Sequence, residues 1–204
     1  MTPPPGVFAR SCGLFYSRCK MMALQTQTLF ISAGHSMSDP GATGNGLTEA
    51  DVVLDFRDRL CDYLADKLVF GRDGQPGQNL PLRQACEMAK RHDVAVEFHC
   101  NAFSRPTATG VETLSDASGK RLGALLCHSM ASVMGIANRG AKGEGSGQHS
   151  RLAFVRAGGI IVELFFITNP NDLATYRDNL DALVTEVGQV LIAEVCEPEY
   201  SDAA

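Results

Sequence analysis

The stretch "AVEFHCNA", residues 95–102, decides the fold, because it has the pattern of a buried strand and yet carries two ionisable side chains. Alternation along a strand places Ala95, Glu97 and His99 on one face and the apolar residues between them on the other. Polar groups inside a sheet cost free energy unless they have partners. We therefore expect a strand over 94–99 that ends at His99, with partners for its polar face in distant segments.

The segments on either side predict strands and helices in alternation. In "LTEADVVLDFRDRLCDYLADKL" (47–68) the apolar residues recur at helical spacing, and Thr48 with Asp51 resembles a capping box that starts the helix. Three more helices are expected over 79–92 (with Pro81 in its first turn), 119–135 and 177–195, and a flexible loop over 141–150. The other expected strands are 28–33, 67–71, 110–114, 151–156 and 159–167. This order predicts one three-layer α/β/α domain with a mostly parallel, about six-stranded sheet flanked by helices.

The length of 204 residues, 45% of them hydrophobic, suits one domain with a full core. We assign this domain to residues 25–197. Residues 1–24 are expected to form a disordered extension, because Pro3, Pro4 and Pro5 precede a stretch without periodicity. Met21 or Met22 is then an alternative start, and deleting residues 1–21 is expected to leave folding and activity intact. Residues 198–204 are expected to form a short tail.

Composition argues against several classes of partner and of site. The net charge of −5 at pH 7, without a Lys/Arg cluster, argues against nucleic acid as a partner. No apolar run approaches the roughly 20 residues of a membrane span, so stable membrane insertion is not expected. The N-terminal segment lacks the continuous apolar run of a signal peptide. The seven cysteines are scattered without a CxxC pair, which indicates neither a zinc ribbon nor a disulfide framework.

Four side chains of the kinds that bind metals are expected at one rim of the sheet. In open α/β sheets, ligands bind beyond the carboxyl ends of the strands. His35 follows the first expected strand, His99 closes the strand 94–99, and Glu163 lies late in the strand that begins near Ile160. Glu49 lies in the first turn of the helix that follows the His35 loop.

These residue types in this arrangement suit a zinc hydrolase. Catalytic zinc takes three protein ligands from His, Asp or Glu and keeps one position open for water. His35, Glu49 and His99 supply such a His₂Glu set, which leaves Glu163 free as a base. A carboxylate beside the metal can take the proton of the water and pass it to a leaving amine.

Taken singly, each residue also has a structural interpretation. For Glu49 the structural interpretation, a carboxylate stabilised by a helix N-terminus, is favoured. For His35 and His99 the structural and the metal-binding interpretations are balanced. Glu163 is the hardest to explain structurally, because "IIVELFFI" (160–167) places a carboxylate in an apolar strand that gains nothing from it.

The chain also resembles the zinc-dependent N-acetylmuramoyl-L-alanine amidases of type 3. The resemblance runs from about residue 28 to about residue 195 and contains four motifs in order. They are "ISAGHSMSDPGA" (31–42), "GLTEADVVLDF" (46–56), "VEFHCNA" (96–102) and "IIVELFFITNPND" (160–172). "GRD" (71–73), "LRQACEMA" (82–89), "GVET" (110–113) and "NRGAK" (138–142) support it.

The resemblance implies that one zinc ion is bound by His35, Glu49 and His99, with Glu163 as the catalytic carboxylate. It also implies cleavage of the amide between the lactyl group of muramic acid and L-alanine in peptidoglycan, which would be the partner. Glu97 departs from the family, which has a serine at its position, as Ser36 and Met37 do from a common pair of glycines. Two interpretations of Glu97 stay open: a hydrogen-bond acceptor behind a ligand histidine, and a side chain that points to solvent at an unpaired edge.

Two further residues are candidates for substrate contacts. Asn101 follows His99 at the strand end, and His149 lies in the glycine-rich loop, although most loop residues bind nothing. His92, at a helix C-terminus, and His128, on the expected surface of a helix, receive structural interpretations.

The setting expected for such an enzyme is phage lysis. An endolysin of this kind is made in the host cytoplasm without a signal peptide and depends on a holin for access to the wall, where it acts after release. A bacterial muropeptide or cell-wall amidase and a zinc peptidase on the same scaffold are the alternatives among enzymes. An inactive peptidoglycan-binding module is the alternative outside them.

Overall fold

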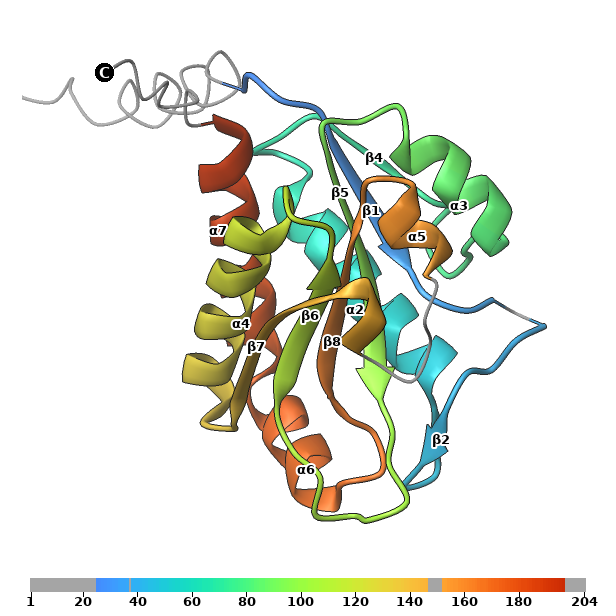
Figure 1. Ribbon diagram of the computed structural model, residues 1–204, viewed down its shortest axis with the longest axis vertical. Helices are drawn as coiled ribbons and strands as arrows, with labels where there is room; N and C mark the ends of the chain where they lie inside the picture. The colour runs from blue at the N-terminus through green and yellow to red at the C-terminus, as the bar shows by residue number, and fades with distance from the viewer. Residues whose placement is uncertain (1–24, 37, 147–151, 197–204) are drawn as a thin grey trace, which may run out of the picture.

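A computed structural model describes residues 25–36, 38–146 and 152–196. Its main sheet has six strands in the order β4-β1-β5-β8-β6-β7, and a two-stranded hairpin, β2 with β3, lies apart from it (Figure 1). All neighbours in the main sheet are parallel except β6 and β8, which are antiparallel. The expected mixed α/β fold with a six-stranded, mostly parallel sheet is confirmed. The bounds of the strands are β1 Leu29–Ala33, β2 Thr43–Gly44, β3 Leu47–Thr48, β4 Phe70–Arg72, β5 Val94–Asn101, β6 Val111–Ser115, β7 Asn138–Gly143 and β8 Ile160–Phe166.

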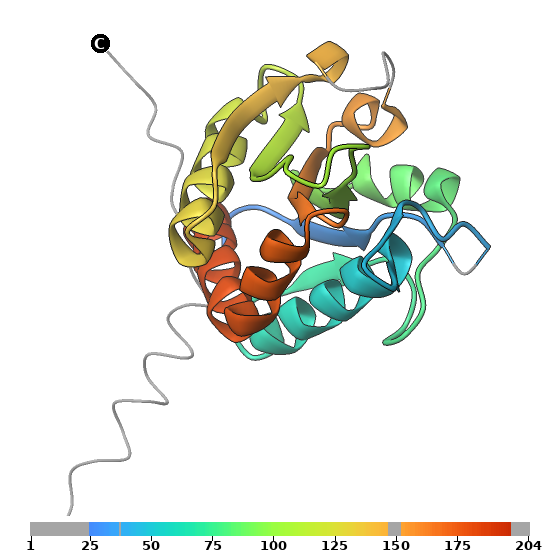
Figure 2. The same ribbon diagram turned by 90° about the horizontal axis from the view of Figure 1, so that it is seen from below.

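Helices cover both faces of the sheet. The helices α2, α4 and α7 pack on one face, where their apolar side chains form the larger core cluster with the sheet. The shorter α3 and α5 cover the other face over a smaller cluster, and the two layers lie on opposite sides of the sheet in Figure 2. The bounds of the helices are α2 Glu49–Leu64, α3 Leu82–Ala89, α4 Lys120–Met134, α5 Ala153–Arg156, α6 Pro170–Asp178 and α7 Leu180–Cys196.

The strand β5 lies inside the sheet, with β1 on one side and β8 on the other. Its alternation is as the sequence predicts: Val96 and Phe98 belong to the larger core cluster, and Ala95 belongs to the smaller one. Glu97 is on the same face as Ala95 and is buried. A central strand buried on both faces therefore carries a carboxylate toward the α3 and α5 layer.

The start of α2 is confirmed. Thr48 is its N-cap, and the Thr48 hydroxyl accepts a hydrogen bond from the Asp51 backbone N–H at 3.2 Å. Glu49 is thus the first residue of the helix, a position that favours negative charge because of the helix dipole.

Two segments differ from the sequence prediction in type. The expected strand 151–156 is wrong: residues from Ala153 form the short helix α5, whose Phe154 and Val155 pack into the smaller core cluster. The sixth strand of the sheet is instead β7, which begins at Asn138, extends into the first part of the expected loop 141–150 and pairs with β6. A short 3₁₀ turn, Glu144–Ser146, follows β7.

Three boundaries also differ. The expected strand 67–71 begins later, as Phe70–Arg72, and Pro81 lies outside α3 as its N-cap residue. The expected closing helix 177–195 is α7, which begins at Leu180. The helix α6, which the sequence did not predict, precedes it and ends at Asp178 with Asn179 as its cap. The Asn179 side chain donates to the Thr175 carbonyl at 2.9 Å, which closes the last turn of α6.

Residues 1–24 and the tail 198–204 lie outside the described residues, so the expected division of the chain stays a prediction. None of the described helices is long and apolar enough to cross a membrane. The described cysteines, Cys61, Cys86, Cys100, Cys127 and Cys196, are all free thiols.

Candidate metal centre

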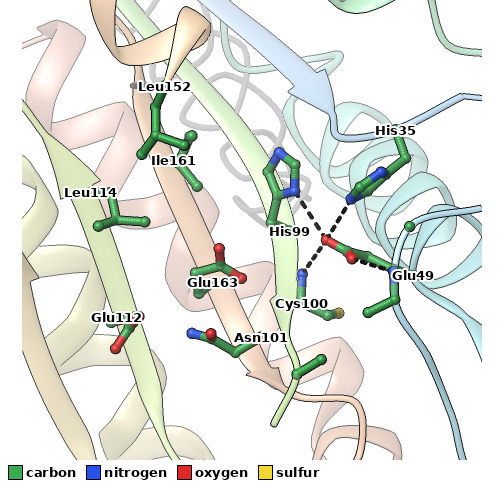
Figure 3. A pocket seen from close by; sticks show the side chains of 13 residues that line it. His35, Glu49, His99, Cys100, Asn101, Glu112, Leu114, Leu152, Ile161 and Glu163 are labelled. Atoms are coloured by element: carbon green, nitrogen blue, oxygen red, sulfur yellow. Dashed lines mark hydrogen bonds and ion pairs between the residues drawn. The ribbon is translucent and has the colours of Figure 1, made fainter. Parts of the chain in front are cut away.

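The fold brings His35, Glu49 and His99 together from three elements. His35 follows the end of β1, Glu49 begins α2, and His99 lies near the carboxyl end of β5 (Figure 3). Each offers one possible ligand atom, and these atoms all lie within 4.8 Å of one another. The convergence that the sequence predicts at the rim of the sheet is therefore present.

Glu49 Oε1 lies at the centre of the cluster. His35 Nε2 and His99 Nδ1 each lie 3.0 Å from this oxygen, and the Cys100 backbone N–H donates to it at 2.9 Å. The other oxygen, Oε2, accepts from the Ala42 backbone N–H at 2.9 Å. Burial alone would raise the pKa of the Glu49 carboxyl, but the hydrogen bonds from the two histidines outweigh it and hold that pKa well below its usual range. Glu49 is therefore an ionised carboxylate inside the protein.

His35 is held by its backbone. Its φ of 64° is in the left-handed region, which a non-glycine residue adopts only when its surroundings impose it. The Asn79 side chain donates to the His35 carbonyl at 2.7 Å, and Asp39 Oδ2 lies 3.2 Å from His35 Nδ1. The hydrogen bond to Glu49 raises the pKa of His35, although burial opposes it.

Glycines make room for both imidazoles. A Cβ atom at Gly34 would lie 2.3 Å from His99 Cε1, and a Cβ atom at Gly41 would lie 2.6 Å from His35 Cδ2. Gly41 also has a φ of +67°. The "AGH" and "PGA" parts of the first motif are thus required by the space that the two rings occupy.

His99 has a carboxylate on either side. Nδ1 faces Glu49, and Nε2 lies 3.1 Å from Glu97 Oε1. Burial acts to lower the pKa of His99, but hydrogen bonds to Glu49 and Glu97 outweigh it and raise that pKa well above the usual value. Glu97 is only 2% exposed, so the interpretation in which it points to solvent at an unpaired edge is wrong.

Glu163 lies beside the cluster without belonging to it. In the register of the parallel strands β5 and β8 it is paired with His99, so both side chains are on the same face of the sheet. No hydrogen bond reaches its buried Oε2 from the described residues. Burial raises the pKa of Glu163 to about 7; the negative charges of Glu49 and Glu112 add to this effect, and His99 opposes it. Glu163 is therefore a buried carboxyl with a pKa of about 7, and its Oε2 has no hydrogen-bond partner among the described residues.

A pocket of about 310 Å³ opens over these groups. The three cluster residues and Glu163 line it, and Asn101 lies at its wall, as Figure 3 shows. The remaining lining residues are Gly41, Ala42, Cys100, Ala102, Glu112, Leu114, Leu152 and Ile161.

Glu112 is a pocket residue that the sequence analysis missed. It lies opposite Glu163 in the register of β6 and β8, and its Oε2 accepts from Arg139 at 2.5 Å and from Lys142 at 2.6 Å. Burial opposes ionisation, but these two hydrogen bonds outweigh it and lower the pKa of Glu112. The signal was present in "GVETL" (110–114), where a carboxylate interrupts a short buried strand as Glu163 does.

The other candidates have different positions. His149 lies outside the described residues. The His92 ring lies 5.4 Å from the Phe30 ring, and its Nδ1 lies 2.8 Å from the Met88 carbonyl, which fits a structural role. His128 is exposed on α4.

The donor set fits a zinc ion. Two imidazole nitrogens and one carboxylate oxygen are ligands that zinc takes in catalytic sites. All three donor atoms are at the pocket, where space for a water and a substrate group exists.

The fold and this site define a class: a mixed α/β protein with a candidate metal-centred hydrolytic site at the carboxyl ends of its parallel strands. Within that class, the family model for N-acetylmuramoyl-L-alanine amidase, Amidase_3, matches residues 29–188, and the chain belongs to this family.

Individual relatives agree with this assignment. The N-acetylmuramoyl-L-alanine amidase LytC of Bacillus subtilis is 30% identical over 165 residues, a match that covers 74% of this chain and 33% of LytC. The chain therefore spans about a third of the length of LytC. YqiI of the same organism is 30% identical over 157 residues, covering 73% of this chain and 74% of YqiI. A crystal structure of a candidate N-acetylmuramoyl-L-alanine amidase from Neisseria meningitidis is 38% identical with a TM-score of 0.77, and the match covers 82% of this chain and 95% of that one.

Proposed function

We propose that this protein is a zinc-dependent N-acetylmuramoyl-L-alanine amidase that cleaves the amide between the lactyl group of muramic acid and L-alanine in peptidoglycan. The observation that carries the proposal is the His35, Glu49 and His99 cluster, with the buried carboxyl of Glu163 beside it in one pocket. Membership of the family supports the choice of substrate.

His35, Glu49 and His99 would hold the ion, each through the atom that now lies in the cluster. When bound, zinc supplies Lewis-acid polarisation of the scissile carbonyl and makes a water more acidic. The Glu49 carboxylate, fixed by the backbone N–H groups of Ala42 and Cys100, keeps its donor oxygen between the two imidazoles.

Glu163 moves the proton. As a carboxylate it accepts a proton from the attacking water, whose oxygen forms a bond to the lactyl carbonyl carbon. It then gives that proton to the alanine nitrogen as the C–N bond breaks, which leaves a lactyl carboxylic acid and a free amine. A pKa of about 7 suits both transfers near neutral pH, because the group gives and takes a proton at similar cost.

Asn101 and His149 are proposed as contacts to the substrate. Asn101 lines the pocket at the end of β5, where its amide can donate to a carbonyl and accept from an amide N–H. For His149 the proposal rests on its place in the sequence alone, shortly before Leu152 at the pocket wall.

Digestion of purified peptidoglycan tests the function. The amidase proposal predicts intact glycan strands and free stem peptides with a new L-alanine amino terminus, both identified by mass spectrometry. Cleavage within the stem peptide would instead identify a zinc peptidase, and binding to the wall without products would identify an inactive binding module. A sample stripped of metal with a chelator and a His99→Ala variant serve as controls, and products that persist in both would contradict the zinc mechanism.

The proposed biological setting is phage lysis, with access to the wall through a holin. Expression in a bacterial host with and without a holin gene tests it. Lysis only in the presence of the holin is expected, whereas wall turnover by the protein without a holin would favour a bacterial amidase.

A further inference from the structure

The buried Glu97 side chain lies within hydrogen-bonding distance of the His99 ring. Its Oε1 lies 3.1 Å from His99 Nε2, and its Oε2 accepts from the Ser32 hydroxyl at 3.0 Å. Ser32 is on β1, directly opposite Glu97 in the strand register, and is fully buried. Both carboxylate oxygens are therefore occupied, one by the histidine and one by a neighbour in the sheet.

The burial of the Glu97 carboxylate in the sheet requires an explanation. Removing a charge from water is costly unless hydrogen bonds replace the lost hydration, and Glu97 is on the face of β5 that carries Ala95 into the smaller apolar core. An apolar residue would fill this position without that cost. The ionisable group that meets the carboxylate is His99, whose Nε2 lies 3.1 Å from Glu97 Oε1.

Glu97 does not belong to the metal cluster. The described residues that form the cluster are His35, Glu49 and His99. Glu97 meets the opposite nitrogen of the His99 ring, so the two edges of one imidazole are divided between a carboxylate inside the cluster and one behind it.

We infer that Glu97 is a positioning residue for the metal ligand His99. Its carboxylate accepts the Nε2–H of the imidazole, which leaves the lone pair of Nδ1 directed at the cluster and makes that nitrogen a better donor. Gly34 leaves the space that this ring position needs, because a Cβ atom there would lie 2.3 Å from His99 Cε1. Ser32 in turn orients Glu97, so residues of β1 and β5 together orient the imidazole of the ligand His99.

This inference rests on the proposed function, because it assumes that the cluster binds zinc. The test therefore measures zinc affinity directly, by competition with a chromogenic chelator, in the full chain. Wild type, Glu97→Ala and Glu97→Gln are compared. Removing a partner of this kind costs roughly 10–100-fold in metal affinity, so Glu97→Ala is expected to weaken zinc binding by that factor. Glu97→Gln retains an acceptor oxygen without the charge. Its zinc affinity is expected to lie between those of wild type and Glu97→Ala.

Asp172 supplies a matched control. It is also a buried carboxylate, 1% exposed, and it accepts from the Thr109 hydroxyl at 2.5 Å and from the Gly110 and Phe166 backbone N–H groups at 3.1 and 3.2 Å. Asp172→Asn is expected to lose thermal stability and to keep the zinc affinity of wild type. An effect of Glu97 that arises only from lost stability would appear equally in this control.

The absorption spectrum of the cobalt-substituted protein gives a second readout, because it reports the ligand field. The Glu97 variants are expected to change its visible bands, and Asp172→Asn is not. If Glu97→Ala does not fold, Glu97→Gln, which has the same size, decides the question. Wild-type affinity and spectrum in Glu97→Gln, together with wild-type affinity in any folded Glu97→Ala, would overturn the inference and leave the proposed function standing. A wild-type protein that binds no zinc would instead overturn the proposed function as well.

Discussion

A single oxygen atom, Glu49 Oε1, organises the candidate site. Two imidazole nitrogens from different elements and one backbone N–H all approach it within 3.0 Å. The sequence identifies the three residues but not this geometry, because the positions of Glu49 and His99 are 50 residues apart and only the sheet brings them together. The carboxylate holds both rings at a spacing that one metal ion can bridge.

At the residue scale, a substitution of Glu163 tests proton transfer separately from metal binding. Glu163→Gln has nearly the same shape and cannot accept a proton, so we expect kcat to fall by roughly 10²–10⁴. Zinc affinity should stay that of wild type, because Glu163 is outside the cluster. An assay of the rate at which products form from peptidoglycan checks kcat, and zinc titration of the same samples checks the zinc affinity. Loss of zinc in this variant would show that Glu163 is a ligand.

The pH dependence of the reaction should reflect the same residue. Only the ionised carboxylate accepts the proton of water, and the Glu163 pKa is raised to about 7 by burial. The rate constant kcat/KM should therefore fall as the pH drops below a value at or below 7, since the positive charge of a bound metal favours ionisation. The residual activity of Glu163→Gln should lack this limb, and an identical pH profile in the variant would assign it to another group.

At the element scale, the N-terminus of α2 delivers Glu49 to the site. Thr48 caps the helix through the Asp51 backbone N–H, and the Thr48 hydroxyl also donates to Asp51 Oδ2 at 2.6 Å. The loop between β1 and α2 is closed by hydrogen bonds from the Glu49 and Ala50 backbone N–H groups to the Ala42 and Pro40 carbonyls. A capped helix start and a closed loop leave Glu49 little freedom.

Thr48→Ala should lower the free energy of unfolding by about 1 kcal/mol, the usual cost of losing an N-cap hydroxyl. Urea denaturation of the metal-free protein measures it, with Thr48→Ser as the variant that keeps the hydroxyl and should behave like wild type. Equal stability of Thr48→Ala and Thr48→Ser would mean that the cap contributes nothing.

At the scale of the whole molecule, the candidate site joins residues in or next to three elements, β1, α2 and β5, which pack against one another. A ligand that binds only when these elements are in place stabilises the entire fold. The strongly held Glu49 and the two histidines exist as a cluster only in the folded state, so zinc should bind the folded chain preferentially.

Zinc should therefore raise the melting temperature. At a free zinc concentration about 1,000 times Kd, the gain is about 4 kcal/mol, and a chain of this size gains roughly 2–4 °C per kcal/mol. We expect a rise on the order of 10 °C between chelator-treated and zinc-loaded protein, measured by calorimetry. The His99→Ala variant should show little rise in melting temperature when zinc is added. A melting temperature that is independent of zinc would count against the cluster as a specific site.

The extent to which local pattern predicts this protein differs between its parts. Alternation identifies β5, a continuous apolar run identifies β8, and helical spacing with a cap identifies α2, because these signals depend only on neighbouring residues. The segment that forms α5 has apolar residues at Leu152, Phe154 and Val155, a spacing too short to separate strand from helix. Its conformation follows from packing against the smaller core rather than from its own periodicity.

The sequence by itself determined the mixed α/β class of the fold, the three cluster residues and the Glu163 carboxyl beside them, since each follows from periodicity, strand ends and residue chemistry. Only the tertiary structure decided that β7 completes the sheet, that Glu97 is buried behind His99, and that Glu112 faces the pocket beside Glu163. The physical reason is that burial and cross-strand pairing depend on which strands become neighbours. Glu97 in a strand with an unpaired edge could point to solvent, whereas between β1 and β8 the same side chain is enclosed and finds its partners across the sheet.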